Sequence, residues 1–309
     1  MKRDVLPAIP YGTIPNVLLL GNGINQTFNK ASWDDLLEEI TTVELSVAEE
    51  KNLKSMPYSL RPVILSNDTI DKQIDKIAPQ MLRCEMSKEQ ALLIKEYVEA
   101  DFDAIFTTNY TYEIECAIEE AFECKYKARS KYRLTTVDGR NSKMNLHKCM
   151  NVLGDKTEHQ IWHVHGEAAR PNSMILGHYY YGKALGEIQT YAAEFMRRYK
   201  GCNSRGLDIK PQSWIDYFLL GNVYIVGFGM DFSEIDIWWL VNYKKRHFQN
   251  IGKIYYFEPN LSDSSKQGIK MLAEAYGINV ITEIVNNGEY LSYYKKIINN
   301  INDKIEGNK

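Results

Sequence analysis

The sequence has no C-x-x-C motif, no long apolar run and almost no net charge. Its five cysteines are odd in number and widely spaced: Cys84, Cys116, Cys124, Cys149 and Cys202. This pattern argues against a disulfide framework and against a zinc ribbon. The N-terminus lacks the apolar segment of a secretion signal, and no stretch approaches the roughly 20 apolar residues that a membrane helix needs. We therefore expect a soluble protein of the reducing cytoplasm.

The charge balance excludes a general binder of polyanions. The 309 residues include 37 Lys and Arg against 40 Asp and Glu, which gives a net charge of −3, and 44% of them are hydrophobic. A chain of this length and composition can fill a sizeable core. Any contact with nucleic acid would have to be local.

One segment, KYKARSKYR at 125–133, departs from this balance. Alternation with period two predicts a strand with one cationic face. The basic residues of that face are Lys125, Lys127, Arg129, Lys131 and Arg133. Two interpretations remain open: an edge strand protected from aggregation by its charge, or a surface that binds an anionic partner such as nucleic acid.

Strand-like and helix-like patterns alternate along the chain. The apolar run NVLLL at 16–20 is typical of a buried parallel strand, and SWDDLLEEI at 32–40 predicts a helix that Ser32 caps together with Asp35. The same succession recurs at 104–122 and 223–241, and again from 253 to the strand-like NVIT near 280. We therefore expect an α/β fold, a Rossmann-like, doubly wound, mostly parallel sheet.

Two polar, helix-like stretches interrupt the alternation. We interpret them as insertions that form a helical accessory layer over the sheet, and no linker or repeat divides the chain. The prediction is a single domain over 1–309, with a core at about 14–43, 101–178 and 214–285 and insertions at about 44–100 and 179–213.

Four polar loops follow predicted strands, and in open α/β sheets ligands bind beyond the carboxyl ends of the strands. They are GNGIN (21–25), TTNY (107–110), HVHGE (163–167) and GFGMDFSEID (227–236), the last of which contains Asp231 and Asp236. The small residues of the first loop would let the backbone approach a pyrophosphate. Because Gln26 replaces the third glycine of a dinucleotide fingerprint, a plain turn is the alternative.

The polar side chains of the second and third loops also have two interpretations each. Asn109 could simply cap the next helix. His163 and His165, on the same side of a predicted strand, could ligate a metal, but no cysteine or carboxylate pattern with a recognised metal spacing accompanies them. We therefore predict no metal and favour His165 as a general base.

The order of the four loops resembles that of the SIR2 (sirtuin) superfamily. GNGIN is similar to the family's G-A-G-I-S phosphate loop, TTN to its T-Q-N, and HG to its catalytic pair, with GFG in the place of G-T-S. The resemblance implies that Asn109 and His165 are catalytic. It also implies a set of dinucleotide-binding residues: Gly21, Asn22, Gly23, Ile24, Asn25, Thr108, Gly227, Phe228, Gly229 and Glu258.

Two departures from the family bear on the activity. There is no zinc ribbon, and Thr111 stands where T-Q-N-I-D has its aspartate, so protein deacylation is not expected. SWDDLLEEI after the first loop and MILGHYYYGKAL after HG resemble the SIR2-like effectors of bacterial antiphage systems. That resemblance implies an NAD+ glycohydrolase that acts in abortive infection, with NAD+ as substrate, no zinc and no further cofactor.

Cleavage of the nicotinamide–ribose bond develops positive charge on the ribose, and nicotinamide leaves as a neutral base. Asn109 would orient the ribose or the attacking water, and a neutral His165 would accept a proton. The predicted apolar walls of the pocket are Ile24, Phe28, Phe106 and Phe228. We expect His163 to be structural.

Such a hydrolase would harm its host if it were always active. We therefore expect a trigger from a co-encoded sensor or activator protein, and a homo- or hetero-oligomer. A different class of function is a non-catalytic nucleotide sensor that uses the same pocket. A third interpretation is a phage-exclusion protein of the AbiH type, which also has a GNG loop after its first strand.

Overall fold

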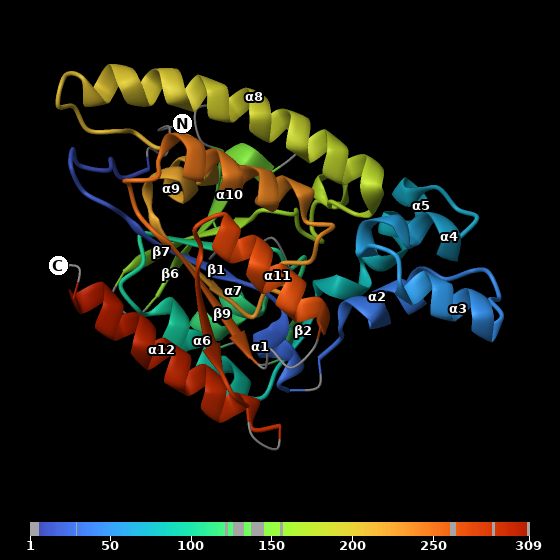
Figure 1. The fold of residues 1–309 in the computed structure, drawn as a ribbon. Coiled ribbons are helices and arrows are strands. Elements are labelled where there is room, and N and C mark those ends of the chain that lie inside the picture. Colours follow the sequence, from blue (N-terminus) through green and yellow to red (C-terminus); the bar gives the residue numbers. More distant parts are fainter. Residues whose placement is uncertain are drawn as a thin grey trace.

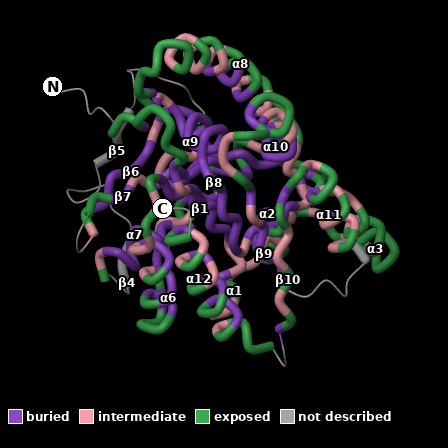
Figure 2. The backbone as a smooth tube through the Cα atoms, turned by 60° about the vertical axis from the view of Figure 1, so that its left-hand side comes forward, coloured by how far each residue is buried: buried purple, intermediate pink, exposed green. Residues whose placement is uncertain are grey.

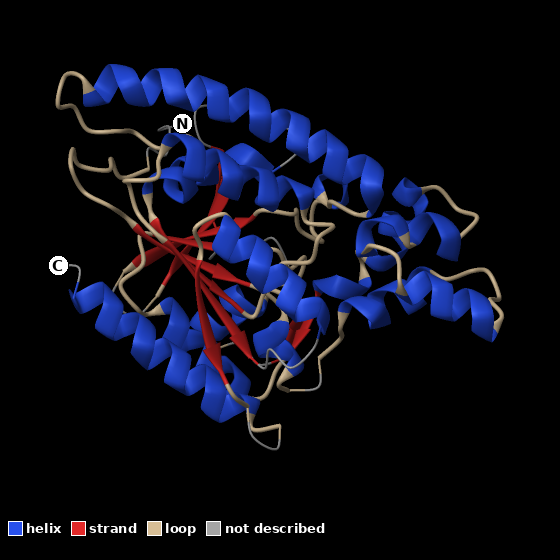
Figure 3. Ribbon diagram, viewed as in Figure 1, coloured by secondary structure: helices blue, strands red, loops and turns tan. Residues whose placement is uncertain are grey.

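A computed structural model describes residues 6–28, 30–120, 123–125, 133–136, 145–154, 157–259, 264–285 and 288–307. Its centre is an eight-stranded sheet with helices on both faces (Figure 3). In spatial order the strands are β10 (Asn279–Glu283), β9 (Ile254–Pro259), β8 (Asn222–Val226), β1 (Asn16–Leu20), β3 (Ala104–Thr107), β7 (Glu158–His163), β6 (Lys148–Leu153) and β5 (Arg133–Thr136). The six strands from β10 to β7 are parallel, and β6 and β5 are antiparallel additions. The predicted fold class is confirmed.

The apolar run of β1 is continuous because both faces of the sheet are covered. Val17 and Leu19 belong to one core, and Leu18 and Leu20 to the other, as the two-residue period of a strand requires. Figure 2 shows the central strands β1 and β8 buried between the helices.

Different helices cover the two faces of the sheet (Figure 1). The first face packs against α8 (Gly177–Asn203), α9 (Trp214–Leu220), α10 (Ile235–His247) and α11 (Ser264–Ala275). The second face packs against α6 (Lys88–Val98), α7 (Glu113–Ile118) and α12 (Tyr290–Gly307). None of the helices in the described part of the chain is long and apolar enough to cross a lipid bilayer.

A separate group of short helices follows the first strand. It contains α2 (Trp33–Ile40), α3 (Val47–Lys54), α4 (Pro62–Leu65) and α5 (Ile70–Ile77), with 3₁₀ turns at Tyr58–Leu60 and Gln80–Leu82. The predicted cap of α2 is confirmed, because Ser32 and Asp35 form a reciprocal capping box. A small core of these helices includes Tyr110 and Met174 from loops at the carboxyl edge of the sheet. The group therefore packs beside the predicted loops.

The predicted first insertion, residues 44–100, contains a strand as well as helices, and one of its helices packs against the main sheet. A short strand, β2 (Arg83–Glu85), pairs with β4 (Glu123–Lys125) in a second, two-stranded sheet. Helix α6 packs against the main sheet, because Leu93, Ile94 and Tyr97 belong to the core of its second face. Most of the second predicted insertion is helix α8. Its side chains in the core of the first face are Tyr181, Ala184, Ile188, Tyr191 and Phe195.

The predicted basic strand lies largely outside the described residues. Lys125 ends β4 in the small sheet, and Arg133 begins β5 in the main sheet. Lys127, Arg129 and Lys131 fall in the segment between them, outside the described residues. The nucleic-acid interpretation of this segment stays a prediction.

Candidate functional site

The predicted loops begin at one row of paired residues across the sheet. Phe257 pairs with Val226, Val226 with Leu20, Leu20 with Thr107, and Thr107 with His163. Four of these residues end their strands, and Phe257 lies two residues before the end of β9. The segments that start immediately after the row contain Glu258, Gly227, Gly21, Thr108, Asn109 and His165. The topology therefore brings the predicted site segments to one edge of the sheet.

The two glycine-rich loops are in direct backbone contact. The N–H of Gly21 donates to the carbonyl of Val226 at 2.9 Å, and the N–H of Gly23 donates to the carbonyl of Gly227 at 2.7 Å. A Cβ on Gly21 would lie 2.4 Å from the Gly227 oxygen, and Gly227 itself has φ +63°. Glycine is thus required by the approach of one loop to the other. These two N–H groups already donate within the protein and are therefore not free to bind a pyrophosphate.

This contact predicts different outcomes for two glycines in the same site. Gly21→Ala must displace backbone atoms and is expected to destabilise the fold by about 1–3 kcal/mol, as overpacking does. Gly229→Ala is the matched control, since a Cβ at Gly229 would have no atom within 4 Å. Urea unfolding of both variants measures the difference, and equal stability of the two would contradict the close approach.

The first helix, α1 (Gly23–Gln26), is held by a chain of amides. The Asn25 side chain donates to Oδ1 of Asn22 at 3.1 Å, and Asn22 donates to the carbonyl of Ala31 at 2.7 Å. From α6, Nε2 of Gln90 donates to Oδ1 of Asn25 at 3.1 Å. Asn25 and Ile24 are each 1% exposed, so in this structure they brace the loop from inside.

Asn109 lies two residues beyond β3 with its side chain half-buried. Its backbone is fixed at both ends, because the N–H donates to Oγ1 of Thr107 at 3.1 Å and the carbonyl accepts from Nδ1 of His163 at 2.8 Å. The side-chain amide makes no hydrogen bond to any residue that the structure describes. It is therefore available to a ligand.

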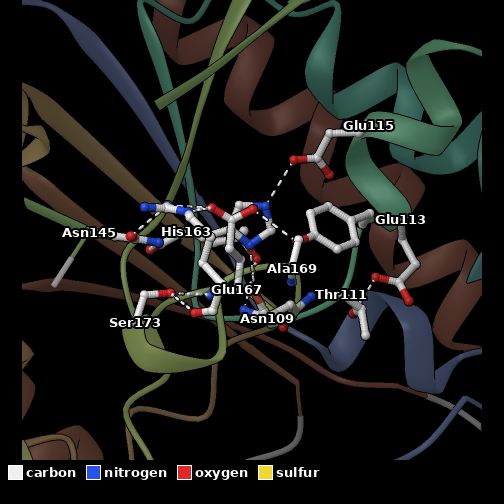
Figure 4. Close-up of polar contacts among 12 residues, drawn as sticks. Asn109, Thr111, Glu113, Glu115, Asn145, His163, Glu167, Ala169 and Ser173 are labelled. Atoms are coloured by element: carbon white, nitrogen blue, oxygen red, sulfur yellow. Dashed lines mark hydrogen bonds and ion pairs between the residues drawn. The ribbon is translucent and has the colours of Figure 1, made fainter. Parts of the chain in front are cut away.

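His163 anchors this loop (Figure 4). Its Nε2 bonds Oε1 of Glu115 at 2.9 Å, and the side chain of Glu115 is fully buried. Burial lowers the pKa of His163, but the Glu115 carboxylate outweighs burial and raises the pKa to about 9. Both ring nitrogens therefore donate at neutral pH, which agrees with the structural role predicted for His163.

His165 does not lie on the same side as His163, and that prediction is wrong. Strand β7 ends at His163, and a turn begins at Val164, with Gly166 at φ +90°. The turn ends the two-residue alternation and directs His165 toward the other layer. Its ring lies 5.6 Å from that of Tyr181 and 6.5 Å from that of Phe228, both in the core of the first face.

Two carboxylates at the start of α10 face His165. Its Nε2 lies 3.1 Å from Oδ2 of Asp236 and 3.6 Å from Oε2 of Glu234. The hydroxyl of Tyr181 donates to the same Glu234 oxygen at 3.1 Å. Asp236 stands out in the sequence only as an acid after a glycine-rich strand end, and Glu234 was not predicted as a site residue.

These contacts set the charge of the cluster. Burial lowers the pKa of His165, but Asp236 and Glu234 outweigh it and raise the pKa to about 9. Burial raises the pKa of Glu234 to about 7, and the nearby His165 opposes that rise. The sequence analysis expects an uncharged His165, but in the structure its imidazole is positively charged at pH 7. Glu234, in contrast, titrates at about pH 7.

Among the described residues, His165, Glu234 and Asp236 form the group of side chains that could hold a metal ion. Ligand atoms of His165, Glu234 and Asp236 lie within 4.8 Å of one another, a spacing that a divalent cation could bridge. In this structure Nε2 of His165 is engaged directly by Asp236. That geometry favours a shared proton between the two residues.

Two other predicted residues are engaged by the protein. The Glu258 carboxylate, 5% exposed, accepts hydrogen bonds from the Tyr256 hydroxyl and from Lys266. A ribose at this position would have to replace one of these partners. Phe106 packs its ring 5.7 Å from that of Trp214 within the core, so it is not a pocket wall.

A comparison with models of known protein families shows which family the chain belongs to. The family model for the SIR2-like domain matches residues 103–281, more than half of the chain. The chain belongs to the SIR2-like family. The matched part of the SIR2-like domain contains Asn109, His165 and the second glycine loop, but neither the GNGIN loop nor α12. No curated protein matches the chain. Membership in this family indicates an NAD-related function.

Proposed function

We propose that this SIR2-like protein hydrolyses NAD+ to nicotinamide and ADP-ribose. The supporting observation is that two polar side chains follow neighbouring parallel strands. The Asn109 amide has no partner among the described residues, and the His165 imidazole is paired with carboxylates. Two touching glycine loops begin at the same row of the sheet. Small residues at strand ends suit a pyrophosphate, and the two polar groups suit the ribose.

The reaction needs a water, an oriented ribose and an acceptor for one proton. As the bond between ribose C1′ and nicotinamide breaks, nicotinamide leaves with the bonding electron pair, and water attacks C1′. The Asn109 amide orients the ribose or this water. The proton lost by the water passes to the Glu234 carboxylate, which lies beside His165 and titrates near neutral pH.

The cluster also suits the charge that develops on the ribose. Two carboxylates flank the single imidazolium of His165, and negative groups fixed in a buried site favour a cationic transition state. Asp236 holds the imidazolium in one orientation at 3.1 Å. His165 therefore acts together with Asp236 and Glu234, instead of as an isolated base.

The direct test is separation of the products. The purified chain is incubated with NAD+, with and without a co-encoded partner, and nicotinamide and ADP-ribose are quantified by chromatography. Equal amounts of the two products support hydrolysis. If neither appears under any condition although NAD+ binds, the site is that of a nucleotide sensor.

The protonation of Glu234 predicts the pH dependence of turnover. Because the pKa of Glu234 is about 7, kcat should fall about tenfold for each pH unit below that value, as the carboxylate becomes protonated. Glu234→Gln should be slow and should lack this acidic limb. Glu38→Gln, the same change at an exposed site in α2, is the control. An acidic limb that persists in Glu234→Gln would exclude Glu234 as the acceptor.

We further propose that turnover is triggered and that depletion of NAD+ serves antiphage defence through abortive infection. His165 and Asp236 are only 3% and 1% exposed, so the nicotinamide end can reach them only after Tyr181 or Phe228 moves. A partner protein or self-assembly would supply that movement. Full activity of the isolated chain in a living host, without toxicity, would contradict a trigger.

A further inference from the structure

The C-terminal helix α12 reaches the point where the two glycine loops meet. A Cβ on Gly23 would lie 2.7 Å from the hydroxyl oxygen of Tyr294, and one on Gly227 would lie 3.3 Å from it. Tyr294 lies at the start of the second turn of α12, beyond the segment that the family model matches. The loop junction thus includes a hydroxyl group from outside the matched domain.

Packing fixes the position of Tyr294. Its side chain is 2% exposed, and its carbonyl accepts a hydrogen bond from the Tyr97 hydroxyl of α6 at 2.6 Å. The ring of Tyr293 lies 5.0 Å away, nearly perpendicular. The hydroxyl is therefore held against the loops by two helices of the second face.

The Tyr294 hydroxyl itself has no hydrogen-bond partner among the described residues. The hydroxyl oxygen of Tyr294 is not one of the fully buried polar atoms of the described residues, so it keeps an accessible surface at the junction where a bound acceptor can pair with it. Burial raises the pKa of Tyr294, and the nearby Glu258 carboxylate raises it further. The group stays protonated and is a donor.

We propose that the Tyr294 hydroxyl donates a hydrogen bond to the pyrophosphate of the bound dinucleotide. The inference rests on the proposed function, which places a pyrophosphate at the two glycine loops. The N–H groups of Gly21 and Gly23 already donate within the protein, so a phosphate here has fewer backbone donors than a free glycine loop would offer. The Tyr294 hydroxyl supplies a further donor at the junction, and because Gly23 and Gly227 carry no Cβ, no side chain of these two residues covers its oxygen.

The experiment compares two adjacent tyrosines. Tyr294→Phe removes the hydroxyl at the junction. Tyr293→Phe removes the hydroxyl of the adjacent residue, which is fully buried, has no partner among the described residues and is not among the atoms next to Gly23 or Gly227. Affinity for ADP-ribose is measured by calorimetry, and thermal unfolding confirms that both variants fold. We expect about tenfold weaker binding for Tyr294→Phe, a typical value for one hydrogen bond to a charged group, and wild-type binding for Tyr293→Phe.

The outcomes separate this inference from the proposed function. Normal ADP-ribose binding by Tyr294→Phe, with hydrolysis intact, overturns the role of Tyr294 alone. A wild-type chain that binds no ADP-ribose overturns both. As a second readout, Tyr294→Phe should raise KM for NAD+ and leave kcat unchanged, because the pyrophosphate is remote from the bond that breaks.

A second pair of variants applies if Tyr294→Phe proves unstable. Tyr294→His, which keeps a donor, should then retain more affinity for ADP-ribose than Tyr294→Leu. Equal affinities of these two variants overturn the proposal.

Discussion

Replacement of His165 by alanine is expected to lower the rate of NAD+ hydrolysis by about a hundredfold to ten-thousandfold. The substitution removes the imidazolium that lies 3.1 Å from Asp236 and 3.6 Å from Glu234. The two carboxylates then face each other without the intervening cation, so the pKa of Glu234 should rise further. Glu234 would no longer be ionised at neutral pH to accept a proton.

Asn109→Ala is expected to cause a loss of similar size for a different reason. Its amide orients the ribose or the water without taking part in proton transfer, so kcat should fall while the pH profile keeps its shape. His178→Ala, which changes an exposed histidine, serves as the control and should retain wild-type kcat and KM.

Chromatographic product analysis and direct NAD+ binding are measured on the same preparations. A hydrolase predicts that His165→Ala and Asn109→Ala still bind NAD+ but do not turn it over. If the wild type binds NAD+ without turnover and both variants bind equally well, the pocket is a sensor. Wild-type turnover by His165→Ala would remove this histidine from the mechanism.

Glu115→Ala is expected to have the largest effect on stability, about 3–5 kcal/mol in the free energy of unfolding. The side chains of Glu115 and His163 are 0% and 2% exposed, and removal of one partner leaves the other as an unpaired buried charge. The same ion pair holds the backbone of Asn109 through Nδ1 of His163. Guanidinium unfolding measures the loss, and Glu96→Ala, at an exposed site in α6, is the control.

The pH dependence of this contribution has a definite sign. The pKa of His163 is raised from 6.5 to about 9 in the folded state. The ion pair therefore contributes its full stabilisation below about pH 6.5, and that contribution is lost as the pH rises through about 9. In Glu115→Gln this part of the dependence should be absent. An unchanged slope between these pH values would show that the pair does not control the titration of His163.

The sequence by itself determined the fold class and the edge of the sheet where the site lies. Continuous apolar runs such as 16–20 indicate strands buried on both faces, and the polar residues after them must lie at the carboxyl ends of parallel strands. The strand-end pattern placed Asn109 and His165 at this edge because a strand end is a local feature, and the resemblance to the SIR2 superfamily implied their catalytic roles. The capping box of Ser32 and Asp35 was likewise predictable from the sequence, because its hydrogen bonds join residues only three positions apart.

Only the tertiary structure decided the environment of these residues. The turn at Val164 separates His163 from His165, and Asp236 reaches His165 from 71 positions away in the sequence. The charge of the imidazole depends on that partner and on burial, which no local pattern encodes. Packing of α12 against α6 likewise brings Tyr294 to the glycine loops. Local pattern thus brought the candidate residues to one edge of the sheet, and long-range contacts set their charge and surroundings.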